Sequence, residues 1–136
     1  MSHSTMEKKV RCIIVTPERT VLDATADFVA FPAFDGEVGI MPGRAPLVAR
    51  LGAGELRLTS GNSSQRYSID GGFAQVIKNV VTILTPRARP VADLDPEQLQ
   101  QQLSEINAEV PTTDEAFASK EQRLVRVRTQ LHLAKK

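Results

Sequence analysis

The side chains that could do acid–base or metal chemistry are few in this sequence, and they lie far apart. The two histidines, His3 and His132, are near opposite ends of the 136 residues, so no histidine cluster can hold a metal ion or activate a nucleophile. Cys12, the single cysteine, lies in the apolar run Val10–Val15, which indicates a buried small hydrophobe in a reducing compartment. Neither a dinucleotide fingerprint nor a Walker lysine motif is present. The sequence therefore predicts a chain that is not an enzyme by itself, with no catalytic residue, no metal and no cofactor.

The residues that could bind another protein gather in one short stretch, Asp35–Leu51, which reads DGEVGIMPGRAPLVARL. Its three glycines can adopt positive φ and its two prolines fix φ, so the backbone is stiff. Ile40 and Met41 are apolar, and Glu37 and Arg44 add one charge of each sign. Such a loop suits a docking surface, because a preorganised backbone lowers the ordering cost of binding. A turn-rich connection between two strands explains the same pattern equally well.

Charged residues are balanced over the whole chain and segregated along it. Seventeen Lys and Arg against sixteen Asp and Glu give a net charge of +1, which provides no electrostatic reason to bind nucleic acid. Residues 93–115 carry seven acidic and no basic side chains, whereas residues 116–136 carry six basic and one acidic. The basic segment contains Arg123, Arg126 and Arg128. Taken alone, these arginines equally fit a solvated face that complements a helix C-terminus.

The first part of the chain has the pattern of an antiparallel β-sandwich, with short apolar runs between turn signals as far as Pro86. Alternation over Glu55–Thr59 and Gln65–Ile69 predicts a hairpin. The Gly71–Gly72 pair predicts a sharp turn. The other strands are expected at Arg11–Thr16, Thr20–Leu22, Thr25–Phe34, Leu47–Leu51, Phe73–Ile77 and Val80–Leu84.

The second part has a helical period and two marked helix starts. Pro86–Pro90 breaks the β pattern, and Asp95 with Gln98 forms a capping box. Pro111 is expected to end this helix, and Thr112–Glu115 is a second capping box. Narrow apolar stripes predict a hairpin of two antiparallel helices that is weak on its own and able to detach. The first stripe is Leu99, Leu103, Ile106 and Val110, and the second is Phe117, Leu124, Val127 and Leu131.

These patterns divide the chain into a disordered start at residues 1–9, a β-sandwich at residues 10–88 and a helical hairpin at residues 89–136. No apolar run approaches the roughly 20 residues that span a bilayer, and the start lacks the apolar core of a signal peptide. A soluble protein is expected, whose contact with a membrane is made only through a partner.

Two motifs make this sequence resemble a known family, the epsilon subunits of F-type ATP synthases. DGEVGIMPGRAPLV at residues 35–48 resembles the signature loop of that family, and IDGGFAQVIKNVVTIL at residues 69–84 resembles its second signature. The resemblance covers residues 8–136 and keeps the motifs in the family's order. It implies an N-terminal antiparallel two-sheet β-sandwich followed by a C-terminal antiparallel helical hairpin.

The resemblance also implies partners for the sandwich. Epsilon subunits are rotor subunits of the central stalk, and their sandwich binds the gamma subunit and the ring of c subunits, which couples ring rotation to the catalytic head. Glu37 is the best candidate for a ring contact. In this sequence Met41 and Arg44 replace the aromatic residue and the histidine that relatives commonly have. The interface residues implied by the resemblance are Glu37, Gly39, Ile40, Met41, Pro42, Gly43, Arg44 and Pro46.

For the hairpin, the resemblance implies a regulatory role. It would switch between a compact form against the sandwich and an extended form that inhibits ATP hydrolysis. Arg123, Arg126 and Arg128 match a basic region that meets an acidic segment of the beta subunit, with the alpha subunit as a further neighbour. Such a subunit would lie peripherally on the cytoplasmic face of the bacterial inner membrane.

Some members of the family bind ATP between the sandwich and the hairpin. Leu94 and Asp95 match their motif, but Gln98 and Leu99 replace its arginine and alanine. The missing arginine removes a phosphate partner, which weakens the case for a nucleotide site. A different class of function also fits the residues, namely a free-standing β-sandwich module that binds a ligand or regulates, with the hairpin as its lid.

Overall fold

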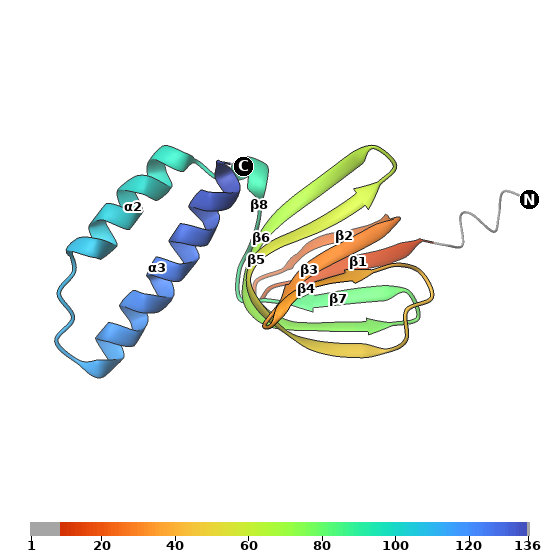
Figure 1. The fold of residues 1–136 in the computed structure, drawn as a ribbon, viewed down its shortest axis with the longest axis horizontal. Helices are drawn as coiled ribbons and strands as arrows, with labels where there is room; N and C mark the ends of the chain where they lie inside the picture. The colour runs from red at the N-terminus through yellow and green to blue at the C-terminus, as the bar shows by residue number, and fades with distance from the viewer. Residues whose placement is uncertain (1–8, 136) are drawn as a thin grey trace, which may run out of the picture.

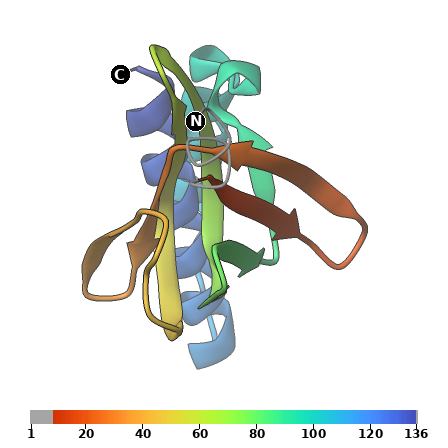
Figure 2. The same ribbon diagram turned by 90° about the vertical axis from the view of Figure 1, so that its right-hand side faces the viewer.

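The computed structural model of this chain describes residues 9–135, in which a β-sandwich and a helical hairpin lie side by side (Figure 1). Viewed from the N-terminal side, the two helices lie behind the sandwich (Figure 2). The predicted disordered start falls, apart from residue 9, outside the described residues. The strands are β1 (Val10–Val15), β2 (Thr20–Ala26), β3 (Phe28–Ala33), β4 (Gly36–Ile40), β5 (Leu47–Ser60), β6 (Ser63–Ile77), β7 (Val80–Leu84) and β8 (Ala88–Pro90).

The strands form one continuous hydrogen-bonded sheet in the order β2-β1-β7-β6-β5-β3-β4, with β8 paired to β6. Its two longest strands, β5 and β6, curve at the end of the sandwich nearest the helices, so each contributes to both layers (Figure 1). The predicted sandwich followed by a helical hairpin is thereby confirmed. One pair, β1 with β7, is parallel, because the chain returns to β1 only after crossing the other layer.

The predicted turn at Gly71 and Gly72 is instead a bend inside β6, which runs unbroken past both residues. Both glycines have positive φ, +84° and +104°, which L side chains rarely adopt. At Gly72 an added Cβ would lie 1.9 Å from the carbonyl oxygen of Leu84 on β7. Glycine is therefore required here by close approach of two backbones, and the chain bends without breaking the strand.

The core of the sandwich is built by the inward side chains of both layers. Phe31, Ile14, Leu56 and Ile83 are among the largest side chains that are fully buried in it. Cys12 is also fully buried, as predicted, and this burial raises the pKa of its thiol to about 12. A thiol that stays protonated at neutral pH is a packing group and not a nucleophile.

Two predicted strand boundaries are wrong because tertiary contacts override local signals. Asp27 separates β2 from β3, since its carboxylate accepts a hydrogen bond from the Gly61 amide at 2.8 Å and pairs with Lys9. The Pro86–Pro90 segment does not end the sheet, because Ala88–Pro90 forms β8 and pairs with β6. A proline at the end of an edge strand is tolerated because no ladder donor is lost there. The sheet thus extends across the predicted boundary between residues 88 and 89.

The first helix of the hairpin, α2 (Pro96–Ala108), follows a short 3₁₀ turn, η1 (Val91–Asp93). Asp95 caps it as predicted and accepts hydrogen bonds from the amides of Glu97 and Gln98 at 3.0 and 3.5 Å. The helix ends three residues before Pro111, so Val110 lies outside it and is 84% exposed. Val110 therefore does not belong to the apolar stripe that the sequence predicts.

The second helix, α3 (Asp114–Ala134), packs Leu124, Val127 and Leu131 against α2 and η1 in a second apolar cluster. Its N-cap is Thr113, one residue later than predicted, which accepts a hydrogen bond from the Ala116 amide at 3.0 Å. Phe117 is 57% exposed, contrary to the prediction. The reason is length: α3 has 21 residues and α2 only 13, so the first turns of α3 have no helix beside them.

Candidate interaction surfaces

The predicted docking loop is shorter than the motif that suggested it. β4 takes up the first part of the motif and β5 begins at Leu47, so only residues 41–46 connect the strands. Gly43 has φ +89°, and its amide donates a hydrogen bond to Asn79 Oδ1 at 2.8 Å, which ties the loop to the turn between β6 and β7. Arg44 Nη1 donates to the carbonyl oxygen of Gly39 at 3.2 Å. The middle of the loop is thus held by two hydrogen bonds, one to the β6–β7 turn and one to β4.

The predicted interface residues differ in what they can offer a partner. Met41 is 63% exposed, and Gly43, Arg44 and Pro46 are exposed beside it. Ile40 is fully buried in the core, because its position in β4 directs its side chain inward, so its assignment to the contact surface is corrected. Pro42 and Gly39 are half-buried, and a Cβ on Gly39 would meet the Phe28 ring at 2.7 Å.

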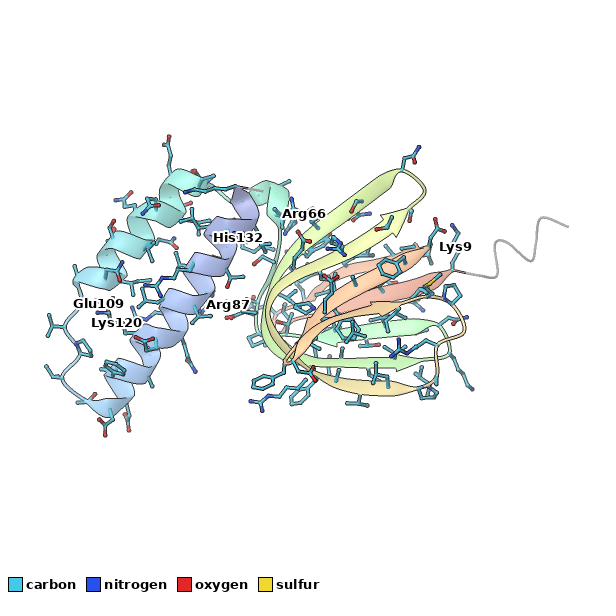
Figure 3. All side chains as sticks on the ribbon, in the orientation of Figure 1. Lys9, Arg66, Arg87, Glu109, Lys120 and His132 are labelled. Carbon is cyan, nitrogen blue, oxygen red and sulfur yellow. The ribbon has the colours of Figure 1, made fainter. Side chains whose placement is uncertain are left out.

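Glu37 lies at the exposed end of a row of alternating charges that crosses the sheet. Its carboxylate pairs with Arg57 at 3.2 Å, and Arg57 pairs with Glu55 at 3.2 Å. Arg66 also pairs with Glu55, at 2.5 Å, and donates to the carbonyl oxygen of Leu133 at 3.3 Å. Figure 3 shows Arg66 between the sandwich and the C-terminal end of α3. Only the Glu55–Arg57 pair is local, because the two residues are two positions apart on β5; Glu37 and Arg66 come from other strands and reach it through the fold of the sheet.

One outward face of the sandwich carries large apolar side chains that the protein leaves exposed. Arg50 pairs with Phe73 across β5 and β6, and Phe73 pairs with Leu84 across β6 and β7, so these side chains share a face. The Arg50 guanidinium also lies 5.1 Å from the centre of the Phe34 ring. This face was not predicted from the sequence, although apolar residues at successive positions of a strand indicate that both faces of the strand are apolar. We call it the outer apolar face; its residues are Phe34, Val48, Phe73, Ile77 and Leu84.

A groove of about 830 Å³ separates the sandwich from the hairpin. Its lining includes three glutamates and five arginines, and the arginines come from the β1–β2 turn, from the segment around β8 and from α3. Figure 3 shows one of these arginines, Arg87, in the gap between the sandwich and the hairpin. Leu94 and Asp95, the candidate nucleotide residues, do not line it: Leu94 is buried in the hairpin cluster and Asp95 caps α2. The groove arginines are Arg19, Arg87, Arg89, Arg123 and Arg126.

The three arginines of the basic helix have different surroundings. Arg123 donates from Nη1 and Nη2 to the two carboxylate oxygens of Glu109, each at 2.7 Å, and this pairing holds the pKa of the Glu109 carboxyl below its usual value. Arg126 pairs with Asp70 of β6 at 3.7 Å. Arg128 is exposed and makes no ion pair within residues 9–135. The structure thus brings two of the predicted residues into internal ion pairs and leaves the third toward solvent.

These surfaces define a class of protein: a β-sandwich with a stiff loop, an exposed apolar face and a helical hairpin in which two of the three arginines named above are paired with acids of the same chain. In the part of the chain that the structure describes, no three His, Cys, Asp or Glu side chains are grouped so as to hold a metal ion. No described helix is long and apolar enough to cross a membrane. The exposed apolar face has the composition of a surface that contacts another protein.

Comparison with known sequences identifies the family. The family model described as the beta-sandwich domain of the ATP synthase delta/epsilon chain matches residues 9–91. An ATP synthase epsilon chain from Rhodopirellula baltica is 48% identical over 126 residues, which are 93% of this chain and 98% of that one. Another, from Nitratidesulfovibrio vulgaris strain DP4, is 32% identical over 132 residues, with 92% and 98% covered. The chain therefore belongs to the family of ATP synthase epsilon chains, which are non-catalytic subunits.

Solved structures agree with this assignment. A chain in the cryo-EM structure of the Euglena gracilis mitochondrial ATP synthase, comprising OSCP, F1 and the c-ring, matches with a TM-score of 0.82 at 25% identity. That match covers 95% of this chain and 82% of the other. A chain from the central stalk and c-ring of the Tetrahymena thermophila mitochondrial enzyme shares the fold, with a TM-score of 0.65 at 17% identity. The similarity includes the hairpin as well as the sandwich, since both matches span more than nine tenths of this chain.

Proposed function

We propose that this chain is a rotor subunit of the central stalk, which couples rotation of the c ring to the catalytic head and inhibits ATP hydrolysis through its hairpin. The observation that carries this proposal is the outer apolar face. Five large apolar side chains, each between 42% and 73% exposed, gather on one sheet face and around it. Contiguous apolar surface of this kind marks a protein–protein interface in a chain of this size.

The gamma subunit is the proposed occupant of the outer apolar face. The core of a stable interface is apolar and rich in aromatic side chains with an arginine among them, and Phe34, Phe73 and Arg50 provide that composition. The ring of c subunits is the proposed partner of the loop at residues 41–46, with Met41 as its apolar tip and Arg44 as its charge. Glu37 is the proposed additional ring contact, since its carboxylate is half exposed at the end of the charge row.

The hairpin is the proposed regulatory element, with the beta and alpha subunits as its partners in an extended form. Support comes from its construction: the apolar cluster of the helices includes no residue of the sandwich core. A unit that keeps its own core can leave the sandwich without exposing that core to water. In the assembled enzyme the chain would lie peripherally on the cytoplasmic face of the bacterial inner membrane, in contact with it only through the complex.

Co-purification tests the assignment of the apolar face. Phe73→Glu places a charge in the middle of the face and should abolish capture of the chain by the gamma subunit. Val110→Glu is the matched control, because Val110 is the most exposed large apolar residue described and lies in the helix connection. Equal capture of both variants and the wild type would refute the assignment, provided that circular dichroism shows all three to be folded.

The basic groove favours a second candidate, a free-standing module that binds an anionic ligand under a helical lid. Arg87 and Arg89 from the segment around β8 oppose Arg123 and Arg126 across it, a distribution that suits an anionic ligand. Titration of the isolated chain with ATP, followed by calorimetry, tests this candidate. Binding of ATP together with failure to associate with gamma and the c ring would favour it over the rotor subunit.

A further inference from the structure

Two of the three arginines on the basic helix are already bound by acids of the same chain. The carboxylate of Glu109, in the connection between the helices, accepts hydrogen bonds from Nη1 and Nη2 of Arg123 at 2.7 Å each. Lys120 donates to the main-chain carbonyl oxygen of Glu109 at 2.8 Å. Asp70, on β6, forms an ion pair with Arg126, with 3.7 Å between Oδ2 of the aspartate and Nη1 of the arginine. In Figure 3, Glu109 and Lys120 lie together near the far end of the hairpin. Each pair joins segments that are separate in the sequence.

The two ion pairs hold two different parts of the compact form. The Glu109–Arg123 pair fastens the connecting segment to α3 and so keeps the hairpin closed. The Asp70–Arg126 pair fastens α3 to the sandwich, together with the hydrogen bond from Arg66 to the carbonyl oxygen of Leu133. On β6 the two contacting residues, Arg66 and Asp70, are four positions apart. On α3 their partners, Leu133 and Arg126, are seven positions apart and come in the opposite order, so the helix runs antiparallel to the strand.

An N–H group of arginine that donates to one carboxylate is not free to donate to another. The Arg123 pair is bidentate, which occupies the face of the guanidinium that would recognise an acidic partner. The Arg126 and Asp70 side chains are 22% and 28% exposed, so this pair is only partly screened by water. Arg128 has no such acid within the described residues and stays available.

We infer that Asp70 and Glu109 are internal competitors for the basic face of α3, which an acidic segment of another protein must displace before it binds. The inference deepens the proposed regulatory role of the hairpin and rests on it for the identity of that protein. The compact form is then stabilised by ionic contacts that a partner can replace one for one. Removal of Glu109 should loosen the hairpin, and removal of Asp70 should loosen the contact between α3 and the sandwich; either change should favour binding of the partner.

The isolated chain provides the first test, with a fluorescein-labelled decaglutamate peptide as the probe in fluorescence anisotropy at low ionic strength. Asp70→Asn and Glu109→Gln should each bind the peptide about two- to fivefold more tightly than the wild type, as expected for release of one surface ion pair. Arg126→Gln in the Asp70→Asn background should remove that gain. Circular dichroism should show that all variants remain folded.

Glu105→Gln is the matched control. Glu105 is an exposed acid of α2 that lines the same groove and makes no ion pair within residues 9–135, and its substitution changes the net charge equally. A gain for Glu105→Gln as large as that for Asp70→Asn and Glu109→Gln would reduce the effect to net charge and overturn the inference. Peptide binding that is the same in all variants, or absent even from a chain that carries both Asp70→Asn and Glu109→Gln, would also overturn it.

The assembled enzyme provides the second test and separates this inference from the proposed function. If the hairpin inhibits, Asp70→Asn should lower ATP hydrolysis relative to the wild type, because it frees Arg126 for the acidic partner, whereas Glu105→Gln should not. A gain in peptide binding with unchanged hydrolysis would refute the inhibitory role and leave the internal competition standing. Hydrolysis that rises in the Asp70→Asn enzyme would contradict the competition itself.

Discussion

Replacement of Gly72 by alanine tests the close approach of β6 and β7, on which the outer apolar face depends. The added Cβ would lie 1.9 Å from the carbonyl oxygen and 2.9 Å from the carbonyl carbon of Leu84. Both are backbone atoms, so no side-chain rotation can relieve the contact. Since Phe73 and Leu84 are paired neighbours beside this point, the two strands must separate where the face is formed.

The expected loss of stability has two parts. An L residue at φ +104° costs about 1–2 kcal/mol in backbone strain. Separation of the strands adds an overpacking cost of about 1–3 kcal/mol. The sum, about 2–5 kcal/mol, is a large share of the roughly 5–15 kcal/mol that stabilises a small domain. Gly72→Ala should therefore unfold at a much lower urea concentration than the wild type.

Gly61→Ala is the matched control for this prediction. Gly61 also has positive φ, +58°, but an added Cβ would meet no atom within 4 Å, so only the strain remains. Urea unfolding followed by circular dichroism should place Gly61→Ala within about 1–2 kcal/mol of the wild type and Gly72→Ala well below it. Equal free energies of unfolding for the two variants would refute the argument from close approach.

Three further outcomes are expected. A chain that ends after Pro90 should keep a folded sandwich that still binds gamma, since the hairpin cluster and the sandwich core share no residue; circular dichroism and pull-down check this. An enzyme assembled with this truncated chain should hydrolyse ATP faster than the wild type in a hydrolysis assay. The Glu109–Arg123 pair holds the pKa of the Glu109 carboxyl below its ordinary value of 4.5, so the stabilising effect of the pair is complete above the ordinary pKa and is lost as pH falls through the lower pKa of the folded state. The midpoint temperature of thermal unfolding should consequently fall less steeply in Glu109→Gln than in the wild type between about pH 5 and pH 3, the range in which a glutamate carboxyl titrates. Glu37→Lys should weaken assembly with the c ring while the isolated sandwich stays folded, and unchanged assembly by gel filtration would remove Glu37 from the ring contact.

Several features of this protein follow from its sequence because they depend on neighbours along the chain. The cap at Asp95 is confirmed because an acidic side chain reaches the amides two and three residues on. Alternation over Glu55–Thr59 and Gln65–Ile69 predicted a hairpin, and these segments pair in β5 and β6. The division into a sandwich and a helical hairpin rests on the same local periods, and the two long motifs were enough to predict the family.

Other features were decided by the tertiary structure, because they join residues that are distant in the sequence. The bend at Gly72 keeps β6 continuous where the sequence predicted a turn, since the partner strands on both sides hold it. Ile40 lies in the core because β4 pairs with β3 in a register that the loop motif does not specify.

The same limit applies to the candidate site. Composition and helical period identify an acidic segment followed by a basic one, but they do not say which acid meets which arginine. Asp70 is 56 residues from Arg126 in the sequence, and it reaches that arginine only because β6 and α3 lie against each other. Coulomb attraction depends on separation in space, whereas the sequence orders charges only along the chain. The charges were therefore predictable from the sequence, and their pairing was decided by the fold.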